Sequence, residues 1–431
     1  MRIAVLGGGV AGLSCAHYLA RAGHTPLVLE PSAALGQLGS PIVHEGLRID
    51  RFSNALRNTD TALCGLLADL GGLGRIAWRP TRSAVSMNGA FYPVSSATDL
   101  LRTAGLARLS SRDRLRAGLG LAYATQLKRY ALDLHGVPAA EWLPRVFGRS
   151  VYETWWRPFL EVRFGDYADS VPAYWVWRQL NSYQTGRREV TGYLRGGIGW
   201  LGERLRRSIE ARGGEVRLHA SITAVESSAT HCAVEVDGME RRVDAVVSTL
   251  PPGELAKLAG GLLARELPNL DVPYQGQVTA LVILQRRLGE YYQTAFMDPA
   301  LPFQRTVEAT HVVPAESLGG RHLLYVRNEC GPHTDAFKLP DDVVRKQALA
   351  SLRQWFPSFD ARDVEAVHIS HNDAAEPITL FGDLRRTIPG RIANTRVFLC
   401  TAAQAYPRRV GWDTEVTLAR ETSALVTACA A

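Results

Sequence analysis

The sequence predicts an α/β protein in which a domain of parallel strands and helices is interleaved with a second domain of antiparallel sheet plus helices. Three observations support this fold class. Residues 1–30 alternate strand, helix and strand, residues 191–250 return to that alternation, and residues 275–330 form short β-rich runs separated by Pro or Gly. Because the two kinds of segment alternate along the chain, each domain must be assembled from discontinuous pieces.

The first thirty residues carry the most specific pattern of the chain. An apolar run over 3–6 leads into the glycine-rich stretch GGGVAG at 7–12, and an apolar-periodic segment follows as far as Gly23. A second apolar run then ends at Glu30. Strand, glycine turn, helix, strand and acid together make the complete context of a dinucleotide-binding fingerprint, which opens a Rossmann-like domain.

Each residue of this fingerprint has a physical task. Gly7 allows the tight turn out of the strand, Gly9 lets the backbone approach a pyrophosphate, and Gly12 lets the helix pack closely on the sheet. Val10 and Ala11 begin the helix, whose free N–H groups and partial positive charge attract phosphates. These five residues are therefore predicted to hold the phosphates of a cofactor.

The carboxylate of Glu30 narrows the choice of nucleotide. At the end of the second strand it can accept hydrogen bonds from the hydroxyls of a ribose. The same negative charge disfavours a 2′-phosphate, so NADP is not expected here. On these residues alone, FAD and NAD both stay open.

Composition restricts the class of protein. A chain of 431 residues has room for two or three domains, and 46% apolar with 21% charged residues is typical of a soluble globular protein. The sequence has no long uncharged apolar run and begins directly with a strand, so a cytoplasmic protein is expected. The net charge of +7 is spread without a basic block, which argues against nucleic acid. Six cysteines without CxxC or CxH spacing predict neither a metal site nor disulfides.

The remaining elements follow from periodicity in chain order. Residues 51–190 are mostly helical in pattern, above all 99–134, where apolar residues recur at helical spacing. Short apolar or alternating runs predict strands at 215–218, 233–236, 243–249, 278–284, 293–296, 305–312, 322–326 and 397–399. Amphipathic stretches predict helices at 200–212, 341–355 and 413–427.

This order of elements predicts the domain boundaries. The nucleotide-binding domain should comprise residues 1–50, 191–260 and 390–431. The second, substrate-binding domain should comprise residues 51–190 and 261–389, including a helical part at 99–180.

Three further stretches carry a resemblance to a known family. They are YLRGG at 193–197, DAVVSTLP at 244–251, and AQAYP at 403–407 followed by Gly411 and a helix. Together with the N-terminal fingerprint, they resemble the flavin-containing amine oxidase superfamily, which includes protoporphyrinogen oxidases and phytoene desaturases. The likeness is greatest to a protoporphyrinogen-oxidase-like branch found in bacterial biosynthetic gene clusters, to which YETWWRPFLEVRFG at 152–165 also corresponds.

The resemblance implies FAD as the cofactor. Besides the fingerprint, it assigns FAD-binding roles to Ile222, Gln404, Gly411 and Trp412. The chain departs from the family at the flavin end of the site. There Gly36 and Gly39 are separated, and the stretch TAA at 401–403 stands where the family usually has Gly-Asp.

The implied chemistry is that of an FAD-dependent oxidoreductase in a specialised biosynthetic pathway. A hydride would pass to flavin N5 from a substrate carbon, either at a C–H bond next to a heteroatom or in the desaturation of a ring. A redox-neutral isomerase or mutase and a non-catalytic flavin-binding protein stay open as alternatives. No lysine falls in the predicted sheet at 275–330, so the water–lysine pair of many amine oxidases is not expected.

Five residues are candidates for lining the reaction site, and none has an assigned catalytic role. Most tryptophans of the tryptophan-rich stretch are expected to pack in the core between helices, and Trp156 is kept as a candidate for an aromatic wall. The resemblance places Tyr406 near the flavin. Glu308 could act as a base or bind an amine, and His311 could titrate near neutral pH. Arg327 could pair with Glu308 across strands or bind an anionic substrate.

The expected partner is a small-molecule substrate. A homodimer stays open, as does docking of the helical stretch 99–134 on a membrane, although an ordinary surface helix explains its arginines better.

Overall fold

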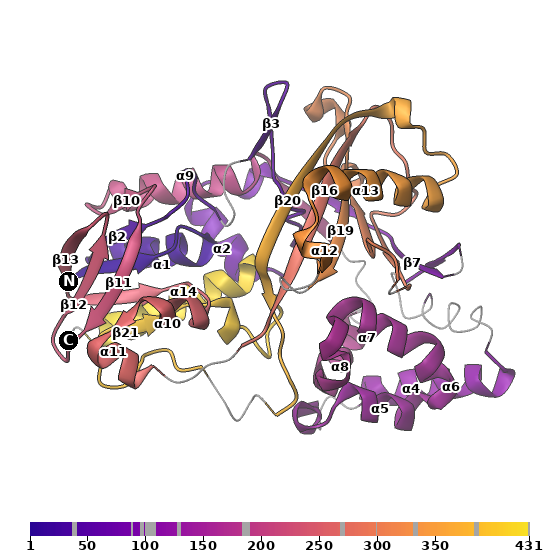
Figure 1. Cartoon of the computed structure of the whole chain (residues 1–431), viewed down its shortest axis with the longest axis horizontal. Helices are drawn as coiled ribbons and strands as arrows, with labels where there is room; N and C mark the ends of the chain where they lie inside the picture. Colours follow the sequence, from indigo (N-terminus) through magenta and orange to yellow (C-terminus); the bar gives the residue numbers. More distant parts are fainter. Residues whose placement is uncertain are drawn as a thin grey trace.

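The computed structural model describes residues 1–36, 41–87, 89–94, 99, 109–126, 131–182, 190–267, 272–298, 300–330, 335–382 and 388–429. The molecule is elongated, with the N-terminus and the C-terminus at the same end (Figure 1). A parallel sheet with its helices occupies that end, whereas a large mixed sheet and a group of helices occupy the other.

The parallel sheet has five strands in the order β10-β2-β1-β14-β21. All neighbouring strands run parallel, and the central strand places Ile3 between Pro26 and Ala245. The strands are β10 (Glu215–Arg217), β2 (Thr25–Leu29), β1 (Arg2–Leu6), β14 (Ala245–Ser248) and β21 (Val397–Leu399). Because both faces of the sheet are covered, these strands read as continuous apolar runs rather than alternating ones.

Helices cover one face of this sheet, and a second sheet covers the other. Ile3 and Val5 pack with the helices α1 (Val10–Arg21), α2 (Thr61–Asp69), α9 (Gly197–Glu210) and α14 (Trp412–Ala428). Ala4 and Leu6 face a four-stranded sheet of order β13-β12-β11-β15 and two short helices. These elements are β11 (Ile222–Ser227), β12 (Cys232–Val236), β13 (Met239–Val243), β15 (Ala259–Gly260), α10 (Pro252–Leu258) and α11 (Gly261–Glu266).

The large mixed sheet has seven strands in the order β20-β16-β19-β18-β17-β7-β8. They are β20 (Val364–Pro377), β16 (Tyr274–Leu284), β19 (His322–Cys330), β18 (Arg305–Glu308), β17 (Gln293–Phe296), β7 (Ser83–Met87) and β8 (Ala90–Pro93). Alternate residues of a strand point to opposite faces. On one face Val278, Ala280 and Val282 pack against α13 (Asp341–Trp355), beside which lies α12 (Asp335–Lys338).

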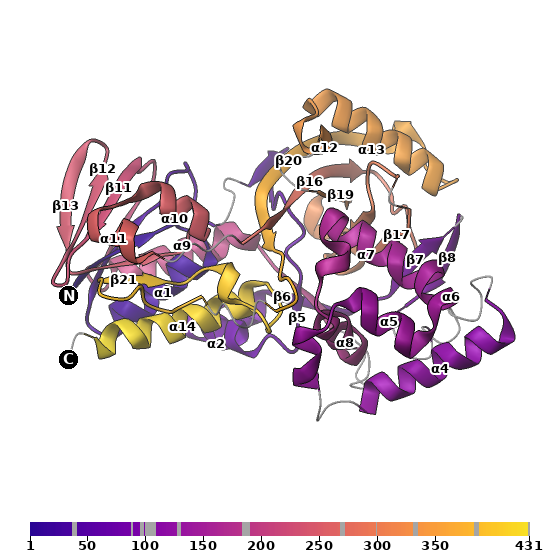
Figure 2. The same ribbon diagram turned by 60° about the horizontal axis from the view of Figure 1, so that its bottom comes forward.

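The other face of the mixed sheet looks toward a group of helices, which lies apart from the parallel sheet in both views (Figures 1 and 2). The helices are α4 (Ser111–Gln126), α5 (Ala139–Phe147), α6 (Arg149–Val151), α7 (Arg157–Phe164) and α8 (Ala173–Ser182). Trp142, Trp156 and Trp175 are buried in their common core. Two small sheets complete the fold. One has the order β5 (Leu56–Arg57), β9 (Val190–Leu194) and β6 (Ile76–Pro80), and the other pairs β3 (Ile42–His44) with β4 (Leu47–Ile49).

The α/β class predicted from the sequence is confirmed, and two predicted strands are too long. The run predicted as one strand at 243–249 is divided, since β13 ends at Val243 and β14 covers Ala245–Ser248. Strand β18 ends at Glu308, and Ala309–His311 form a 3-10 helix, so the prediction of a strand to residue 312 is wrong. The chain turns there because the Glu308 carboxylate accepts two backbone N–H groups from another loop. Strand β20 had no predicted counterpart, since half of its side chains are polar and most are only partly buried.

Other predictions are met only in part. Of the helical stretch 99–134, α4 covers 111–126, whereas 100–108 and 127–130 lie outside the described residues. Across the part of the chain that the structure describes, every helix is too short or too polar to cross a membrane. The division into two domains stays a proposal, although residues from the start, middle and end of the chain do share the parallel sheet.

Candidate active site

The glycines of the fingerprint differ in why they are needed. Gly7 has φ +105°, a conformation that favours glycine. A Cβ on Gly12 would lie 2.0 Å from the carbonyl oxygen of Gly7, so helix α1 could not approach the strand. Gly9, with φ −72° and ψ −177°, adopts extended backbone that any residue tolerates. The fold therefore gives no conformational reason for glycine at position 9, which is the position expected to face a pyrophosphate.

The start of α1 fits the phosphates of a dinucleotide. Its N-cap residue Gly9 makes no side-chain cap, and its first turn contains no acidic residue. The N–H groups of this turn and the positive end of the helix dipole therefore favour an anion. The Glu30 carboxylate lies alongside, where it accepts hydrogen bonds from the backbone N–H of Gly8 at 2.6 Å and of Ser32 at 2.9 Å. The Ser32 hydroxyl donates to the same Oε1 atom at 2.6 Å, so Oε2 is the oxygen that keeps a further lone pair for a ribose hydroxyl.

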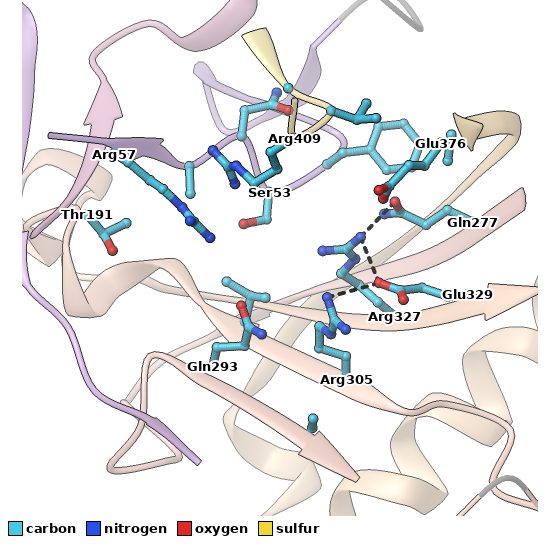
Figure 3. Close-up of a pocket in the computed structure, with 18 of the residues that line it drawn as sticks. Ser53, Arg57, Thr191, Gln277, Gln293, Arg305, Arg327, Glu329, Glu376 and Arg409 are labelled. Carbon is cyan, nitrogen blue, oxygen red and sulfur yellow. Dashed lines mark hydrogen bonds and ion pairs between the residues drawn. The ribbon is translucent and has the colours of Figure 1, made fainter. Parts of the chain in front are cut away.

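A cavity of about 460 Å³ lies between the parallel-sheet lobe and the mixed sheet. One wall comes from the loop 50–57 and from residues 409–412 and Glu415 at the start of α14. The opposite wall is the face of the mixed sheet that does not contact α13, as Figure 3 shows for Gln277, Arg305 and Arg327. Phe159 and Trp175 of the helical group add an aromatic side.

The sheet wall is polar because side chains alternate along its strands. In β16, Gln275 and Gln277 share a face, and in β19 so do Arg327 and Glu329. The register places Arg305 of β18 directly opposite Arg327, which adds it to the same face. Farther along these strands the same face becomes apolar and joins a core that excludes water. The polar residues are therefore gathered at one end of the sheet, at the cavity.

Four charged side chains meet around Glu329 in this wall. Arg163 of α7 pairs with Glu329 at 2.5 Å and with Glu376 of β20 at 2.5 Å. Arg305 and Arg327 lie 3.1 Å and 3.2 Å from the other carboxylate oxygen, Oε1 of Glu329. Arg327 also donates to Oε1 of Gln277 at 2.9 Å. Three guanidinium groups thus face two carboxylates, and we call these five residues the arginine cluster.

Electrostatics keep the arginine cluster ionised at neutral pH. Burial alone would raise the pKa of Glu329, but the three guanidiniums, Arg163 first, outweigh burial and lower it to about 2. Burial lowers the pKa of Arg305 to about 10, against the attraction of Glu329. Both groups are therefore charged at pH 7, and the cluster keeps one net positive charge.

The wall formed by the loop 50–57 and the start of α14 contains two carboxyl groups, those of Asp50 and Glu415. Asp50 accepts a hydrogen bond from the backbone N–H of Ile198 at 3.2 Å, which fixes the start of α9, and burial raises its pKa. Gly197 must be glycine there, because a Cβ would lie 2.1 Å from the Asp50 carboxylate. Burial also raises the pKa of Glu415 to about 7, against a hydrogen bond from the backbone N–H of Ala11. The Glu415 carboxyl therefore occupies one N–H group of the α1 first turn.

Comparison with known proteins decides the family. The family model described as flavin-containing amine oxidoreductase matches residues 10–391. The chain belongs to this family. This confirms the resemblance predicted from the sequence, and the chain is an FAD-dependent oxidoreductase. The chain is 28% identical over 290 residues to the 15-cis-phytoene desaturase of Synechococcus elongatus. The aligned part covers 60% of this chain and 59% of the desaturase.

Several solved structures share the fold of this chain. A protein of Exiguobacterium sp. 255-15, provisionally named a protoporphyrinogen oxidase, matches with a TM-score of 0.79 and 18% identity, covering 99% of this chain and 98% of that one. Reduced UDP-galactopyranose mutase matches at 0.76 and 15%, with 99% and 96% covered. Putrescine oxidase bound to putrescine matches at 0.73 and 15%, with 99% of both chains covered. At these identities the likeness establishes the fold alone.

The residues assigned to FAD by resemblance lie at several places in the structure. Gly411 and Trp412 begin α14 and line the cavity. Ile222 begins β11 opposite Val236, away from the cavity. Gln404 accepts from the Thr401 N–H at 2.9 Å and donates to the Pro389 carbonyl at 3.2 Å, so its amide holds its own loop. Of the two separated glycines, Gly36 donates to the Gly8 carbonyl at 2.9 Å, and Gly39 lies outside the described residues.

Only one of the five predicted site-lining residues, Arg327, lies on the cavity. Trp156 packs in the helical core against Phe147, with ring centroids 5.3 Å apart, and Trp175 lines the cavity in its place. Tyr406 hydrogen-bonds His135 Nδ1 beside a separate small pocket.

The remaining two candidates, Glu308 and His311, lie behind the sheet wall. Glu308 is 1% exposed and accepts the backbone N–H groups of Leu288 and Gly289 at 3.0 Å and 2.9 Å. His311 Nε2 lies 3.1 Å from the Gly289 carbonyl oxygen. The suggested pair of Arg327 with Glu308 does not form, because the register sets Glu308 opposite Leu324.

Sequence reasoning missed most of the arginine cluster and Glu415. The signal for the cluster was present, since polar residues two apart, at Gln275 and Gln277 and at Arg327 and Glu329, interrupt strands that are otherwise largely apolar. Glu415 had no comparable signal, because acidic residues in the first turn of a helix are ordinary.

Replacing Glu308 with Ala should destabilise the protein without emptying its cofactor site. Two buried N–H groups would lose their acceptor, which should lower the free energy of unfolding by about 2–5 kcal/mol. Urea unfolding measures this change, and the FAD content per folded molecule should match the parent protein. The exposed neighbour Glu316, replaced with Ala, serves as the control. A loss of FAD in Glu308→Ala, at unchanged stability, would show that Glu308 acts on the cofactor instead.

Proposed function

We propose that this chain oxidises a small organic substrate in a specialised biosynthetic pathway. The substrate would lose a hydride from a C–H bond next to a heteroatom, or from a ring that becomes desaturated. The continuity of the cavity supports this most directly. It extends from Gly411 and Glu415, beside the first turn of α1, to the polar face of the mixed sheet. A substrate on that face would share one space with a cofactor held at α1.

Different residues would bind the cofactor and the substrate. Gly9, Ala11 and Glu30 would hold the phosphates and ribose of FAD, and Gly411 with Trp412 would border it at the cavity. Bound FAD supplies a hydride acceptor, N5 of its isoalloxazine ring. Phe159 and Trp175 would exclude water along one side and favour an apolar or planar substrate body.

The proton chemistry of the site is restricted by its charges. Glu329 has a pKa of about 2 and three guanidinium partners, so it cannot accept a proton at neutral pH and is not a general base. The described lining residues include no lysine, so they offer no candidate for a water–lysine pair. The role of the sheet wall is therefore to orient a substrate by charge and hydrogen bonding, and not to transfer a proton.

Purified protein should be yellow and release FAD on denaturation. Under anaerobic conditions a substrate of the proposed kind should bleach the flavin absorbance, and oxygen or a quinone should restore it. A panel of ring alcohols, amines, carboxylates and phosphates, mixed in a stopped-flow cell, tests this. Protein that is colourless and takes up no FAD on titration would contradict the proposal. Turnover of pre-reduced enzyme with no consumption of an acceptor would favour a redox-neutral isomerase or mutase.

A further inference from the structure

We propose that the substrate carries an anionic group, a carboxylate or a phosphate, which binds Arg305 and Arg327 on the sheet wall of the cavity. This inference rests on the proposed function and specifies its substrate class. The proposed substrate has the opposite charge to the one that the family description suggests, because an amine substrate would be a cation. Arg305 and Arg327 would thus be binding residues that fix the orientation of the substrate.

The first argument is the charge that the arginine cluster leaves unbalanced. Three guanidiniums share Glu329 and Glu376, so one positive charge has no carboxylate of its own. A fourth guanidinium, that of Arg178, also lies close enough to Glu376 to interact with it electrostatically. Unbalanced buried charge is costly unless a counter-ion joins it. A bound anion would supply that counter-ion, whereas an ammonium group would add to the excess.

The second argument is the access that the cavity gives to the two guanidiniums. Arg163 donates to two carboxylates and to Gln275, and its side chain is only 11% exposed. The side chains of Arg305 and Arg327 are about one-fifth exposed, 20% and 19%, and both line the cavity. Their Nε atoms are buried, so the Nη groups are the donors that would meet a ligand. Two adjacent planar guanidiniums match the paired oxygens of a carboxylate or phosphate.

The third argument is the position of the pair within the cavity. Arg305 and Arg327 are cross-strand partners, so their guanidiniums are held side by side by the sheet and lose little freedom on binding. Figure 3 shows both side chains rising from the sheet toward the cavity, with Gln293 nearby on the same wall. Phe159 and Trp175 offer apolar surface in the same cavity. The substrate that fits best therefore joins an anionic group to an apolar ring.

Four ring compounds that differ chiefly in charge test this inference. FAD-loaded protein is titrated by calorimetry with phenylacetate, phenyl phosphate, benzylamine and benzyl alcohol, and the flavin spectrum is followed in parallel. At least one anion should bind at least about tenfold more tightly than benzylamine and benzyl alcohol. The carboxylate and phosphate arms show which anion the site prefers. Benzylamine binding as tightly as both anions, or no binding of either anion, would overturn the inference.

Substitutions of Arg305 and Arg327 test whether this pair binds the anion. Arg305→Gln and Arg327→Gln should each weaken the binding of the preferred anion about 10- to 100-fold. Arg→Lys at either position should weaken this binding less. The control is Arg286→Gln, because Arg286 pairs with Asp363 outside the cavity and should stay within about twofold of the parent protein. Thermal unfolding of each variant checks its folding. Parental affinity in both Gln variants would also overturn the inference.

The FAD content of each preparation separates the two proposals. FAD-loaded protein that prefers neither anion would refute the anionic substrate and leave the flavoenzyme intact. Protein that selects anions through Arg305 and Arg327 but never takes up FAD would refute the flavoenzyme and leave the anion site.

Discussion

Protein with Asp in place of Gly9 should fold normally and contain no FAD. The backbone at position 9 is extended, with φ −72°, so the new side chain meets no conformational penalty. Asp is moreover a favoured N-cap residue, and α1 has no side-chain cap in the parent protein. Folding and cofactor binding should therefore respond in opposite directions.

The size of the effect follows from electrostatics. Like charges about 4 Å apart repel by about 4 kcal/mol at an effective dielectric constant near 20, which is about a thousandfold in affinity. Gly9→Asn is the matched control, since it has nearly the same shape and no charge. Flavin absorbance of the purified proteins and calorimetric titration with FAD measure the outcome. Parental FAD content in Gly9→Asp would refute the placement of the pyrophosphate at α1.

FAD binding should weaken as pH rises above 7, and Glu415→Gln should abolish this dependence. The Glu415 carboxyl accepts the N–H of Ala11, one of the donors expected to hold the phosphates. Once ionised, it competes with the phosphates for this donor and repels them. If only the protonated form admits FAD, the dissociation constant should rise about tenfold per pH unit above the pKa of about 7.

The same carboxyl should govern the stability of the apoprotein. Its pKa is raised in the folded state, from 4.5 to about 7, so its stabilising contribution is complete below pH 4.5 and is lost as pH rises through 7. Glu415→Gln should therefore stabilise the apoprotein at pH 8 by about 3 kcal/mol and change little at pH 4.5. Glu421→Gln is the control, because Glu421 lies on the same helix and pairs with Arg408 at the surface. Equal pH profiles for the parent protein and Glu415→Gln would contradict this role.

The fingerprint could be predicted because its information is local. Gly7, Gly9, Gly12 and Glu30 lie within one strand-helix-strand unit, whose geometry sequence spacing determines. The arginine cluster could not be predicted in this way. Its members lie on α7, β18, β19 and β20, and they meet only because the strand register sets Arg305 opposite Arg327.

The errors have the same origin. Glu308 follows Arg305 by three residues and was expected to face the substrate, yet the odd spacing directs it to the opposite face of the sheet. The clustering of tryptophans in the sequence makes Trp156 a candidate for an aromatic wall of the site. Only the helix packing determines that Trp175 reaches the cavity instead.

The position of β1 has a consequence for how the protein is made. This strand carries the fingerprint and is synthesised long before its neighbour β14, which begins at Ala245. At about 5–20 residues per second, the ribosome leaves one edge of β1 without its partner for roughly ten to fifty seconds. A nascent chain in this interval exposes an apolar strand edge that can pair with other chains. The cofactor site at β1 would then be complete only after β14 and β21 have emerged from the ribosome.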